Sequence, residues 1–516
     1  MAWGVCWSSG LLAPAIPIWM FLLFLAAAPL TTVRQAARLG AVSGLAQYAV
    51  GAHFQLALVA YSSLAVAIYL MTLLYIVPFA AGCLALAFWL ERRTGVRREL
   101  GIALLFPLLE VFRAVSPLSL PADLTAHAFG RLPAWLAWSP WIGPYGVTLW
   151  STLVAYLAWR AICVRRRAPL RAAFATGALL LWLAPPLTHV ARGRGDTAQA
   201  APFKVAIVQP SLSLEQKLDR SYAPDIWRRL EELTLAGSSG VDLVLWPETI
   251  RPGPVLWNDN EPFHDAEVEA IARKAGVPIL YGCVIGRVDP AVRRVSALYN
   301  GAALARPDGS PGAWYGKQQL VPFLERVPFA RWIGYDPAQR AASNRSWLTL
   351  LGNFSQGPEA TIFSVGPARI GALICYEGLY PALARQYRRD GANLLAVMVN
   401  DSWWGRTFFP AWHARMSAAR AIETGNPVVR AGNNGVSCAI GRDGRLIGET
   451  RLSEVTTLVA SVDVGPVPDT LYVRYGNWIL LLDALVLATL GVRGFLLMHG
   501  RRSLPGLAAP AGDPGA

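Results

Sequence analysis

Charged residues are scarce in this chain. Only 16% of its 516 residues are Asp, Glu, Lys or Arg, whereas about 25% is typical of a soluble protein. Hydrophobic residues make up 54%, and they gather in long runs that leave 200–470 with an ordinary globular composition. The shortage of charge argues against an ordinary soluble enzyme and predicts a membrane part joined to a globular part.

Acidic residues are the scarcer of the two charged kinds. The 33 Asp and Glu against 47 Lys and Arg leave a formal net charge of +14. Such a charge could serve nucleic-acid binding, but the arginines cluster beside the hydrophobic runs, at 92–98, 165–171 and 501–502. Arginine clusters of this kind mark the cytoplasmic loops of membrane proteins. We therefore assign the charge to membrane topology and expect no nucleic-acid partner.

Cysteine is too rare and too scattered to build a disulfide framework or a metal centre. The six cysteines include no CxxC pair and no spacing typical of metal ligands. A bridge between Cys283 and Cys438 stays open if the globular part lies in an oxidising compartment. No metal and no other cofactor is expected, and Cys375 is left as a candidate for chemistry.

The N-terminus lacks the basic residues of a cleavable signal peptide, so the first apolar run is expected to stay in the chain. Nearly uncharged apolar runs cover 11–30, 54–90, 100–116, 145–164, 172–188 and 477–497. A run of roughly 17–25 residues can span a bilayer, and 54–90 is long enough for two passes. A weaker stretch at 35–53 fits a further span or a helix at the membrane surface. We predict a transmembrane helical domain at 1–190 with six or seven spans, and one more span at 473–498.

The arginine clusters also predict on which side the globular domain lies. With all three clusters in the cytoplasm, the domain at 203–470 lies outside it. Residues 191–202 are polar and small, which is typical of a linker. Residues 499–516 are rich in Pro, Gly and Ala, and a disordered cytoplasmic tail is expected there.

Within 203–470, short apolar segments alternate with amphipathic ones. Strands are predicted at 203–209, 241–246, 277–282, 296–305, 368–374 and 394–399, and helices at 226–235, 266–275 and 409–424. The Asn300-Gly301 pair inside the fourth strand is interpreted as a bulge or bend. Strands that are apolar without interruption are buried on both faces. The pattern predicts a layered α/β domain.

Three polar side chains in this domain make up the inventory of an acyl-transfer site. Glu248 follows a strand and the Trp246-Pro247 pair, Lys317 stands in an aromatic loop, and Cys375 directly follows another strand. Taken singly, each has an ordinary explanation as a solvated carboxylate, a surface lysine or a small buried side chain. Together they provide a base for the thiol proton, a cation for an oxyanion and a nucleophile. We predict these three roles for Glu248, Lys317 and Cys375.

Five further residues are candidates for supporting roles, namely Glu325, Glu377, Trp403, Arg430 and Asn433. The two glutamates are either second carboxylates near the nucleophile or partners of neighbouring arginines. The tryptophan belongs to a Trp-Trp pair that would meet lipid chains or cap the core. The last two fit a tight polar turn, and His413 has no partner at metal-ligand spacing, so a structural role is expected for it.

The three site residues resemble those of the nitrilase, or carbon-nitrogen hydrolase, superfamily, where they stand in WPET, GK and ICYE. Four longer stretches narrow the resemblance to the apolipoprotein N-acyltransferase family: KQQLVPFLERVP at 317–328, NDSWWG at 400–405, HARMSAARAIE at 413–423 and RAGNNG at 430–435. The resemblance covers 203–465 closely and the membrane half mainly in its layout. It implies an α-β-β-α sandwich held at the periplasmic side of a bacterial inner membrane by a multi-pass helical domain.

The resemblance also implies a reaction and its partners. Cys375 would take an acyl chain from a phospholipid as a thioester, and the α-amine of a diacylglyceryl-cysteine lipoprotein would then attack it. Glu248 would move the protons and Lys317 would hold the oxyanion. Glu325, Tyr376 and Glu377 are carried over as supporting residues by matching position. A monomer is expected.

Three residues depart from the family pattern and bear on the acceptor. Gln319 stands where the family has His, Leu324 where it has Gly, and Leu218 where it has Trp. Two alternatives therefore stay open: a membrane-tethered paralogue or amidase that acts on another amine or amide, and a non-catalytic membrane scaffold. A transporter is disfavoured because Glu110 and Arg113 are the only buried charge pair expected in the spans.

Overall fold

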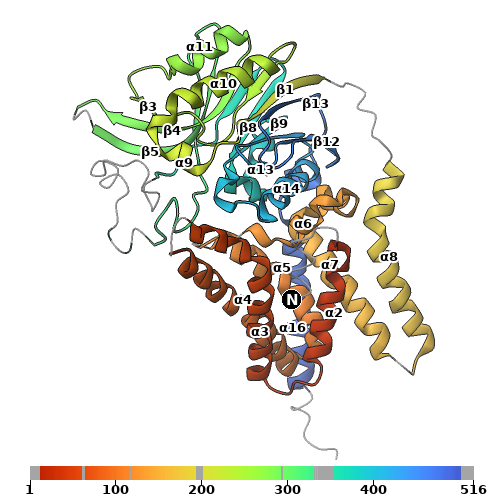
Figure 1. The fold of residues 1–516 in the computed structure, drawn as a ribbon. Coiled ribbons are helices and arrows are strands. Elements are labelled where there is room, and N and C mark those ends of the chain that lie inside the picture. The colour runs from red at the N-terminus through yellow and green to blue at the C-terminus, as the bar shows by residue number, and fades with distance from the viewer. Residues whose placement is uncertain are drawn as a thin grey trace, which may run out of the picture.

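The computed structural model describes residues 12–500 except 61–63, 117, 120, 165, 193–200, 292–293, 330–331, 333 and 335–353. In this part of the chain a bundle of long helices carries a two-sheet domain at one end, and a last helix returns into the bundle (Figure 1). Most of the predicted linker and most of the predicted tail fall outside the described residues, as do Arg165, Arg501 and Arg502.

The bundle is built from long helices joined by short turns. The long helices are α2 (Ile16–Ala27), α3 (Val33–Gly51), α4 (Leu64–Thr94), α5 (Arg98–Val115), α7 (Ser139–Cys163), α8 (Ala168–Arg192) and α16 (Trp478–Gly500). The short elements are η1 (Ala13–Ala15), η2 (His53–Ala60), η3 (Pro121–Asp123), α6 (Thr125–Ala128), η4 (Phe129–Arg131) and η5 (Pro133–Leu136). Four described helices are long and apolar enough to cross a membrane: Ala65–Thr94, Ser139–Cys163, Ala168–Ala191 and Trp478–Leu497. The total of six or seven spans before the globular domain stays a prediction.

The apolar run at 54–90 does not form two passes. It begins as η2 and continues as the single helix α4, which carries Pro78 inside it. Helix α3 packs along α4 at very short range, since a Cβ on Gly40 would lie 2.3 Å from the carbonyl oxygen of Ala80 and one on Gly44 would lie 2.7 Å from the Ala80 side chain. Small residues four apart allow membrane helices to approach this closely. The weak stretch at 35–53 is therefore part of a tightly packed helix pair.

Two sheets form the globular domain. The first has the order β13-β1-β2-β4-β5-β6, with β3 beside β4. Its strands are β1 (Pro202–Gln209), β2 (Leu243–Leu245), β3 (Pro254–Trp257), β4 (Ile279–Asp289), β5 (Arg294–Ala305), β6 (Trp314–Gly316) and β13 (Thr456–Asp463). The second has the order β12-β11-β10-β9-β8-β7, from β7 (Ile362–Val365), β8 (Ala368–Ile374), β9 (Leu394–Val399), β10 (Val428–Gly432), β11 (Cys438–Ile440) and β12 (Leu446–Glu449).

Strand β1 shows why the central strands are apolar on both faces. Phe203, Val205 and Ile207 belong to the core between the two sheets, whereas Ala206 and Val208 belong to the core under the outer helices. Helices α10 (Ala223–Gly237) and α11 (Ala266–Ala275) cover the first sheet, and α13 (Pro381–Arg389) and α14 (Phe409–Thr424) cover the second (Figure 1). The expected α-β-β-α sandwich is confirmed.

Two details of the sequence interpretation are resolved by the structure. The bulge at Asn300-Gly301 is wrong, because β4 and β5 pair without a break through Val284↔Asn300 and Cys283↔Gly301, and their irregularity lies at Arg287/Val288. A glycine is needed at 301 because a Cβ there would lie 2.9 Å from the Tyr315 carbonyl oxygen on β6. Cys283 and Cys438 are both free and buried, so the open possibility of a bridge between them is not realised.

Helix α14 joins the sandwich to the helical bundle. Its residues Phe409, Trp412 and Met416 share one hydrophobic cluster with side chains of α2, α4 and α7. Gly130 lies directly against α14, where a Cβ would come within 2.3 Å of the Arg415 carbonyl oxygen. The two parts therefore form a continuous core, and the bundle lies against the edge of the sandwich at which the site residues are found.

Candidate active site

Glu248 stands just beyond the carboxyl end of β2 and is held from two strands. Trp246 before it is fully buried, and its indole N–H donates to Thr234 Oγ1 on α10 at 2.9 Å. Glu248 Oε1 accepts from Asn300 Nδ2 at 2.8 Å, and its Oε2 accepts from the backbone N–H of Asn400 at 2.8 Å. The carboxylate is 7% exposed, so these two donors replace water as its hydrogen-bond partners.

Lys317 follows β6 and is 1% exposed. Its Nζ lies 2.9 Å from Glu325 Oε2 and 3.7 Å from Glu248 Oε1. Asn300 Nδ2, which binds Glu248, also donates to Glu325 Oε1 at 2.8 Å. One ammonium and one amide thus serve two buried carboxylates, and buried charges persist only when paired in this way. Of the two explanations open for Glu325, the structure favours a second carboxylate in the site.

Cys375 begins the turn η7 (Cys375–Leu379) at the end of β8, with a φ of 51°. A non-glycine residue in this left-handed region costs about 1–3 kcal/mol and persists only where its surroundings hold it. Glu377 supplies such a restraint, since its Oε2 accepts from the N–H of Ile374 at 2.8 Å and its Oε1 from the N–H of Gln318 at 2.7 Å. Glu377 therefore ties the turn of Cys375 to the loop of Lys317.

Burial and charge together set the resting protonation of the site. Burial raises the pKa of the Cys375 thiol well above its usual value, and Glu248 raises it further, whereas Lys317 lowers it. Burial alone would lower the pKa of Lys317, but the carboxylates of Glu325 and Glu248 outweigh burial and raise it. At neutral pH the cysteine is therefore a thiol and the lysine an ammonium. The thiol needs a base when it attacks, and Glu248 lines the same cavity.

A cavity of about 1440 Å³ connects this site with the helical bundle. Glu248, Lys317 and Cys375 all line it. Its walls also include apolar side chains of η2 and α4, among them Phe54, Leu58, Ile68, Met71 and Leu74. Pockets for small ligands commonly measure about 300–1,000 Å³. The cavity therefore has room for a long apolar substrate whose reactive end lies at Cys375.

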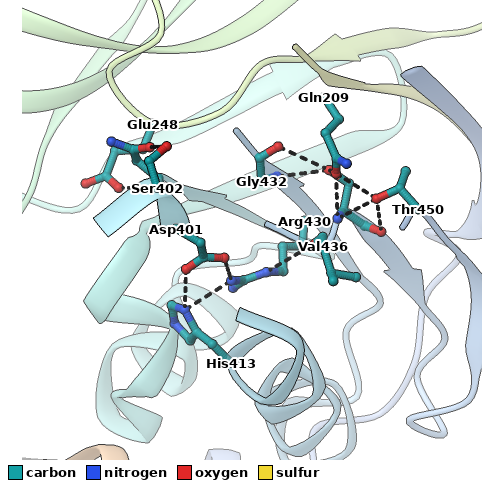
Figure 2. A network of polar contacts seen from close by, with 11 residues as sticks. Gln209, Glu248, Asp401, Ser402, His413, Arg430, Gly432, Val436 and Thr450 are labelled. Atoms are coloured by element: carbon teal, nitrogen blue, oxygen red, sulfur yellow. Dashed lines mark hydrogen bonds and ion pairs between the residues drawn. The ribbon is translucent and has the colours of Figure 1, made fainter. Parts of the chain in front are cut away.

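Arg430 belongs to a buried ionic cluster behind the site. Its Nη2 lies 2.9 Å from Asp401 Oδ2, and His413 Nδ1 lies 3.2 Å from Asp401 Oδ1 (Figure 2). Burial would raise the pKa of Asp401, but Arg430 and His413 together lower it below its usual value. Arg430 is not one of the described residues that line the cavity. Its contacts hold the turn η8 (Asp401–Trp404), which agrees with the structural explanation of this residue.

Asn433 holds a neighbouring segment, whereas Trp403 belongs to that turn and lines the cavity. Asn433 Nδ2 donates to the Leu212 carbonyl oxygen at 2.8 Å, and its Oδ1 accepts from the Leu212 N–H at 2.9 Å, so it clamps the segment after β1. Trp403 lines the cavity, as does Trp404, whose ring centroid lies 5.1 Å from that of Phe54 on η2. The tryptophan pair therefore faces the cavity where the sandwich meets the bundle.

Tyr376 connects the nucleophile's turn to the bundle. Its hydroxyl donates to the carbonyl oxygen of Ser119, which lies between α5 and η3. The Ser119 side chain in turn is hydrogen-bonded to the Tyr380 hydroxyl. Tyr376 also lines the cavity. The position of Cys375 is thus coupled to the helical part through its immediate neighbour.

Two polar residues of the cavity, Asn300 and Lys217, are not among the site residues predicted from the sequence. Asn300 was interpreted only as a bulge, although a polar side chain in the middle of an apolar strand was a usable signal. Lys217 gave no signal in its polar segment, yet its Nζ donates to the Glu248 carbonyl oxygen and to Thr249 Oγ1, each at 3.1 Å. Both side chains line the cavity.

The three departures from the family pattern are also located by the structure. Leu218 and Leu324 line the cavity. Gln319 is not one of the described lining residues, and its N–H donates to Glu377 Oε1 at 3.0 Å. Two of the three departures therefore alter the walls around the substrate.

Comparison with known proteins agrees with this geometry. The carbon-nitrogen hydrolase family profile matches residues 204–470, and that of the apolipoprotein N-acyltransferase N-terminal domain matches residues 2–157. An apolipoprotein N-acyltransferase of Geobacter metallireducens is 31% identical over 485 residues, which cover 90% of this chain and 89% of that relative. The chain belongs to the apolipoprotein N-acyltransferase family.

Other members of the apolipoprotein N-acyltransferase family match over shorter lengths. The protein of Chlorobaculum tepidum is 26% identical over 77% of this chain and 76% of its own length, and that of Azotobacter vinelandii is 32% identical over 65% and 62%. The family match includes the membrane half, where the sequence resembled the family mainly in layout. Together with the four helices that are long and apolar enough to cross a membrane, it identifies an enzyme of the bacterial membrane.

Proposed function

We propose that this protein moves a fatty acyl chain from a phospholipid, through a thioester on Cys375, to the N-terminal amine of diacylglyceryl-cysteine lipoproteins. The observation that carries the proposal is the cavity that joins Glu248, Lys317 and Cys375 to the apolar side chains of η2 and α4. A small amide would need no such extension, whereas a long acyl chain needs an apolar wall beside the nucleophile.

In the first half of the reaction Glu248 takes the proton of the Cys375 thiol as the sulfur attacks an ester carbonyl carbon of the phospholipid. The negative charge that develops on the carbonyl oxygen is stabilised by the Lys317 ammonium. The carbon–oxygen bond to glycerol then breaks, and Glu248 returns the proton to the glycerol oxygen. The products are a lysophospholipid and the acyl thioester on Cys375.

In the second half the amine of the lipoprotein attacks the thioester carbonyl. Glu248 takes a proton from the amine, and Lys317 again stabilises the oxyanion. The carbon–sulfur bond breaks, and the proton passes to the Cys375 sulfur. An α-amine has a reference pKa of about 7.7–8.0, so a partly deprotonated nucleophile is present near neutral pH.

We place the sandwich on the periplasmic side of the inner membrane. Helix α16 starts at the sandwich and runs away from it, and Gly494 near its end lies against Thr94 at the end of α4. Arg92 and Arg93 therefore lie at the end of the bundle opposite the sandwich, as a cytoplasmic cluster would. One chain supplies every residue that the mechanism uses, which supports a monomer.

A second candidate is an N-acyltransferase-like enzyme with another amine acceptor. It is favoured by one observation, namely that the cavity wall carries Leu218 and Leu324 where the family has Trp and Gly. A scaffold without activity is disfavoured, because it would not need the buried arrangement of Glu248, Lys317 and Cys375.

The test is mass spectrometry of the purified protein after incubation with phospholipid. The peptide that contains Cys375 is expected to gain one acyl chain in the wild type and in the control Cys163→Ser, whose cysteine is exposed on α7, but not in Cys375→Ala. Addition of a diacylglyceryl-cysteine peptide should then move the acyl chain to that peptide. An enzyme that hydrolyses short amides but never carries an acyl adduct would show that the proposal is wrong.

A further inference from the structure

One wall of the cavity carries two cations that form no ion pair with a carboxylate among the described residues. Lys217 ends α9 (Leu214–Leu218) and Arg220 begins η6 (Arg220–Tyr222), and both side chains line the cavity. In the described part of the chain neither charged group forms an ion pair with a carboxylate within 4.0 Å, and the carboxylate of Glu248 acts on Lys217 only at longer range. Arg251 also lines the cavity, but its guanidinium is held by Asp265 at 2.9 Å and Glu267 at 3.1 Å. Unlike Arg251, Lys217 and Arg220 are therefore available to pair with an anionic group of a ligand.

Lys217 has hydrogen-bonding capacity to spare. An ammonium carries three N–H donors. Two of them go to the Glu248 carbonyl oxygen and to Thr249 Oγ1, and no third acceptor is found among the described residues. Burial lowers the pKa of Lys217 to about 8, and Glu248 offsets the effect only in part. An anion bound beside Lys217 would favour the charged ammonium and so offset the effect of burial on its pKa.

The acidic residue between the two cations does not neutralise them. Asp219 also lines the cavity, but its Oδ1 accepts from the N–H of Ser221 at 2.8 Å and caps η6. Lys217 and Arg220 together with Asp219 leave one net positive charge on this wall. A phosphodiester carries one negative charge.

The position of the cations relative to the reacting groups indicates the ligand. Lys217 binds the main chain of Glu248, so it lies beside the catalytic carboxylate, while η2 and α4 supply the apolar wall. In a glycerophospholipid only the glycerol unit separates the ester carbonyl from the phosphorus atom. With the ester at Cys375 and the acyl chain along α4, the phosphate must lie close to the reacting atoms but off the apolar wall.

We propose that Lys217 and Arg220 bind the phosphodiester of the phospholipid donor and so select donors that carry it. The proposal rests on the proposed function and adds a site for the headgroup. Donors without a phosphate make no use of this wall. Replacing Lys217 or Arg220 with a neutral residue should therefore reduce the preference for donors with a phosphate over donors without one.

The test compares two acyl donors of equal chain length, phosphatidylglycerol and a p-nitrophenyl ester, by the rate at which each acylates Cys375. A hydrogen bond to a charged group contributes enough for roughly a 10- to 100-fold change. Lys217→Met is expected to lower kcat/KM for phosphatidylglycerol, mainly through KM, about tenfold or more beyond any loss with the p-nitrophenyl ester, because Lys217 also holds the main chain of Glu248. Arg220→Gln should act in the same direction. Arg228→Gln, whose side chain on α10 is 69% exposed, is the matched control.

Several results would overturn the proposal. Equal losses with both donors in Lys217→Met would mean that the lysine only holds the main chain of Glu248. Arg220 makes no such contact, so an Arg220→Gln variant that behaves like Arg228→Gln would refute headgroup binding even if Lys217→Met fails to fold. Strong inhibition of the wild type by inorganic phosphate would reassign the site to a soluble anion, whereas no inhibition is expected. A wild type that no donor acylates would instead refute the proposed function.

Discussion

Replacing Asn300 with leucine is expected to disable the site while leaving its shape nearly intact. Asn300 is 3% exposed, and its Nδ2 donates to Glu248 Oε1 and to Glu325 Oε1, each at 2.8 Å. Leucine has a similar volume but no donor. In Asn300→Leu the two carboxylates would keep only Lys317 between them.

The size of the effect follows from those two contacts. A hydrogen bond to a charged group contributes about 1.5–3 kcal/mol, and the substitution removes two. Asn300 Oδ1 has no partner in the described part of the chain, so its loss offsets some of that cost. We expect the free energy of unfolding to fall by about 2–4 kcal/mol. If the loss of one such hydrogen bond raises the activation free energy of proton transfer by its full contribution, acylation of Cys375 slows roughly 10- to 100-fold.

The assay is single-turnover acylation of Cys375 by a p-nitrophenyl ester, together with thermal unfolding in detergent. The control is Asn260→Leu, because Asn260 is exposed in a loop of the same domain. Asn300→Leu should be slow and should unfold several degrees lower, while the control matches the wild type. If Asn300→Leu acylates at the wild-type rate and keeps its Tm, the amide does not organise the carboxylates and the reasoning is refuted.

Three further predictions follow from the geometry of the site. In Gly282→Ala the new Cβ would lie 2.4 Å from the Pro247 carbonyl oxygen and displace the turn of Glu248, so the rate of acylation should fall about tenfold or more. The control Gly448→Ala, whose Cβ first meets the Leu458 side chain at 3.3 Å, should be acylated at the wild-type rate. Because burial raises the pKa of Cys375, its alkylation by iodoacetamide should be slow at neutral pH and slower still in Lys317→Met, and a rate above that of a free cysteine peptide would contradict this. Burial raises the pKa of Glu377 to about 7 from about 4.3 in the unfolded chain, so its contribution favours folding at low pH and is lost as the pH rises through that window. Between about pH 4.3 and about pH 7 the Tm of Glu377→Gln should therefore fall less than that of the wild type. An equal fall of Tm in the two proteins would contradict this prediction.

The fold could be predicted to a large extent because its strongest signals are local. The helix 409–424 was predicted to the residue, because a glycine directly after it is a local stop signal; Gly425 has a φ of 71° in the structure. The strand 394–399 was also predicted correctly, because an uninterrupted apolar run can be buried on both faces. The bulge at Asn300-Gly301 was wrong, because nothing within β5 tells which residues of β4 lie opposite it.

The candidate site was predictable only in part. Glu248 and Cys375 were identified because each follows a predicted strand, and Lys317 because it stands in an aromatic loop; the structure brings all three to one cavity. Asn300 and Lys217 were missed because their roles depend on hydrogen bonds to residues far away in the chain. The apolar wall was predicted only as membrane helix, not as part of a substrate cavity.

The sequence by itself determined that apolar helices are joined to an α/β sandwich and that a thiol, a carboxylate and an ammonium are available for acyl transfer. Hydrophobic periodicity and residue chemistry are local properties, so they can be followed along the chain. Only the tertiary structure decided that Asn300 bridges Glu248 and Glu325, and that Lys217 and Arg220 face the same cavity as α4. Those relations depend on how two sheets and a helical bundle pack against one another, which no segment of the sequence specifies alone.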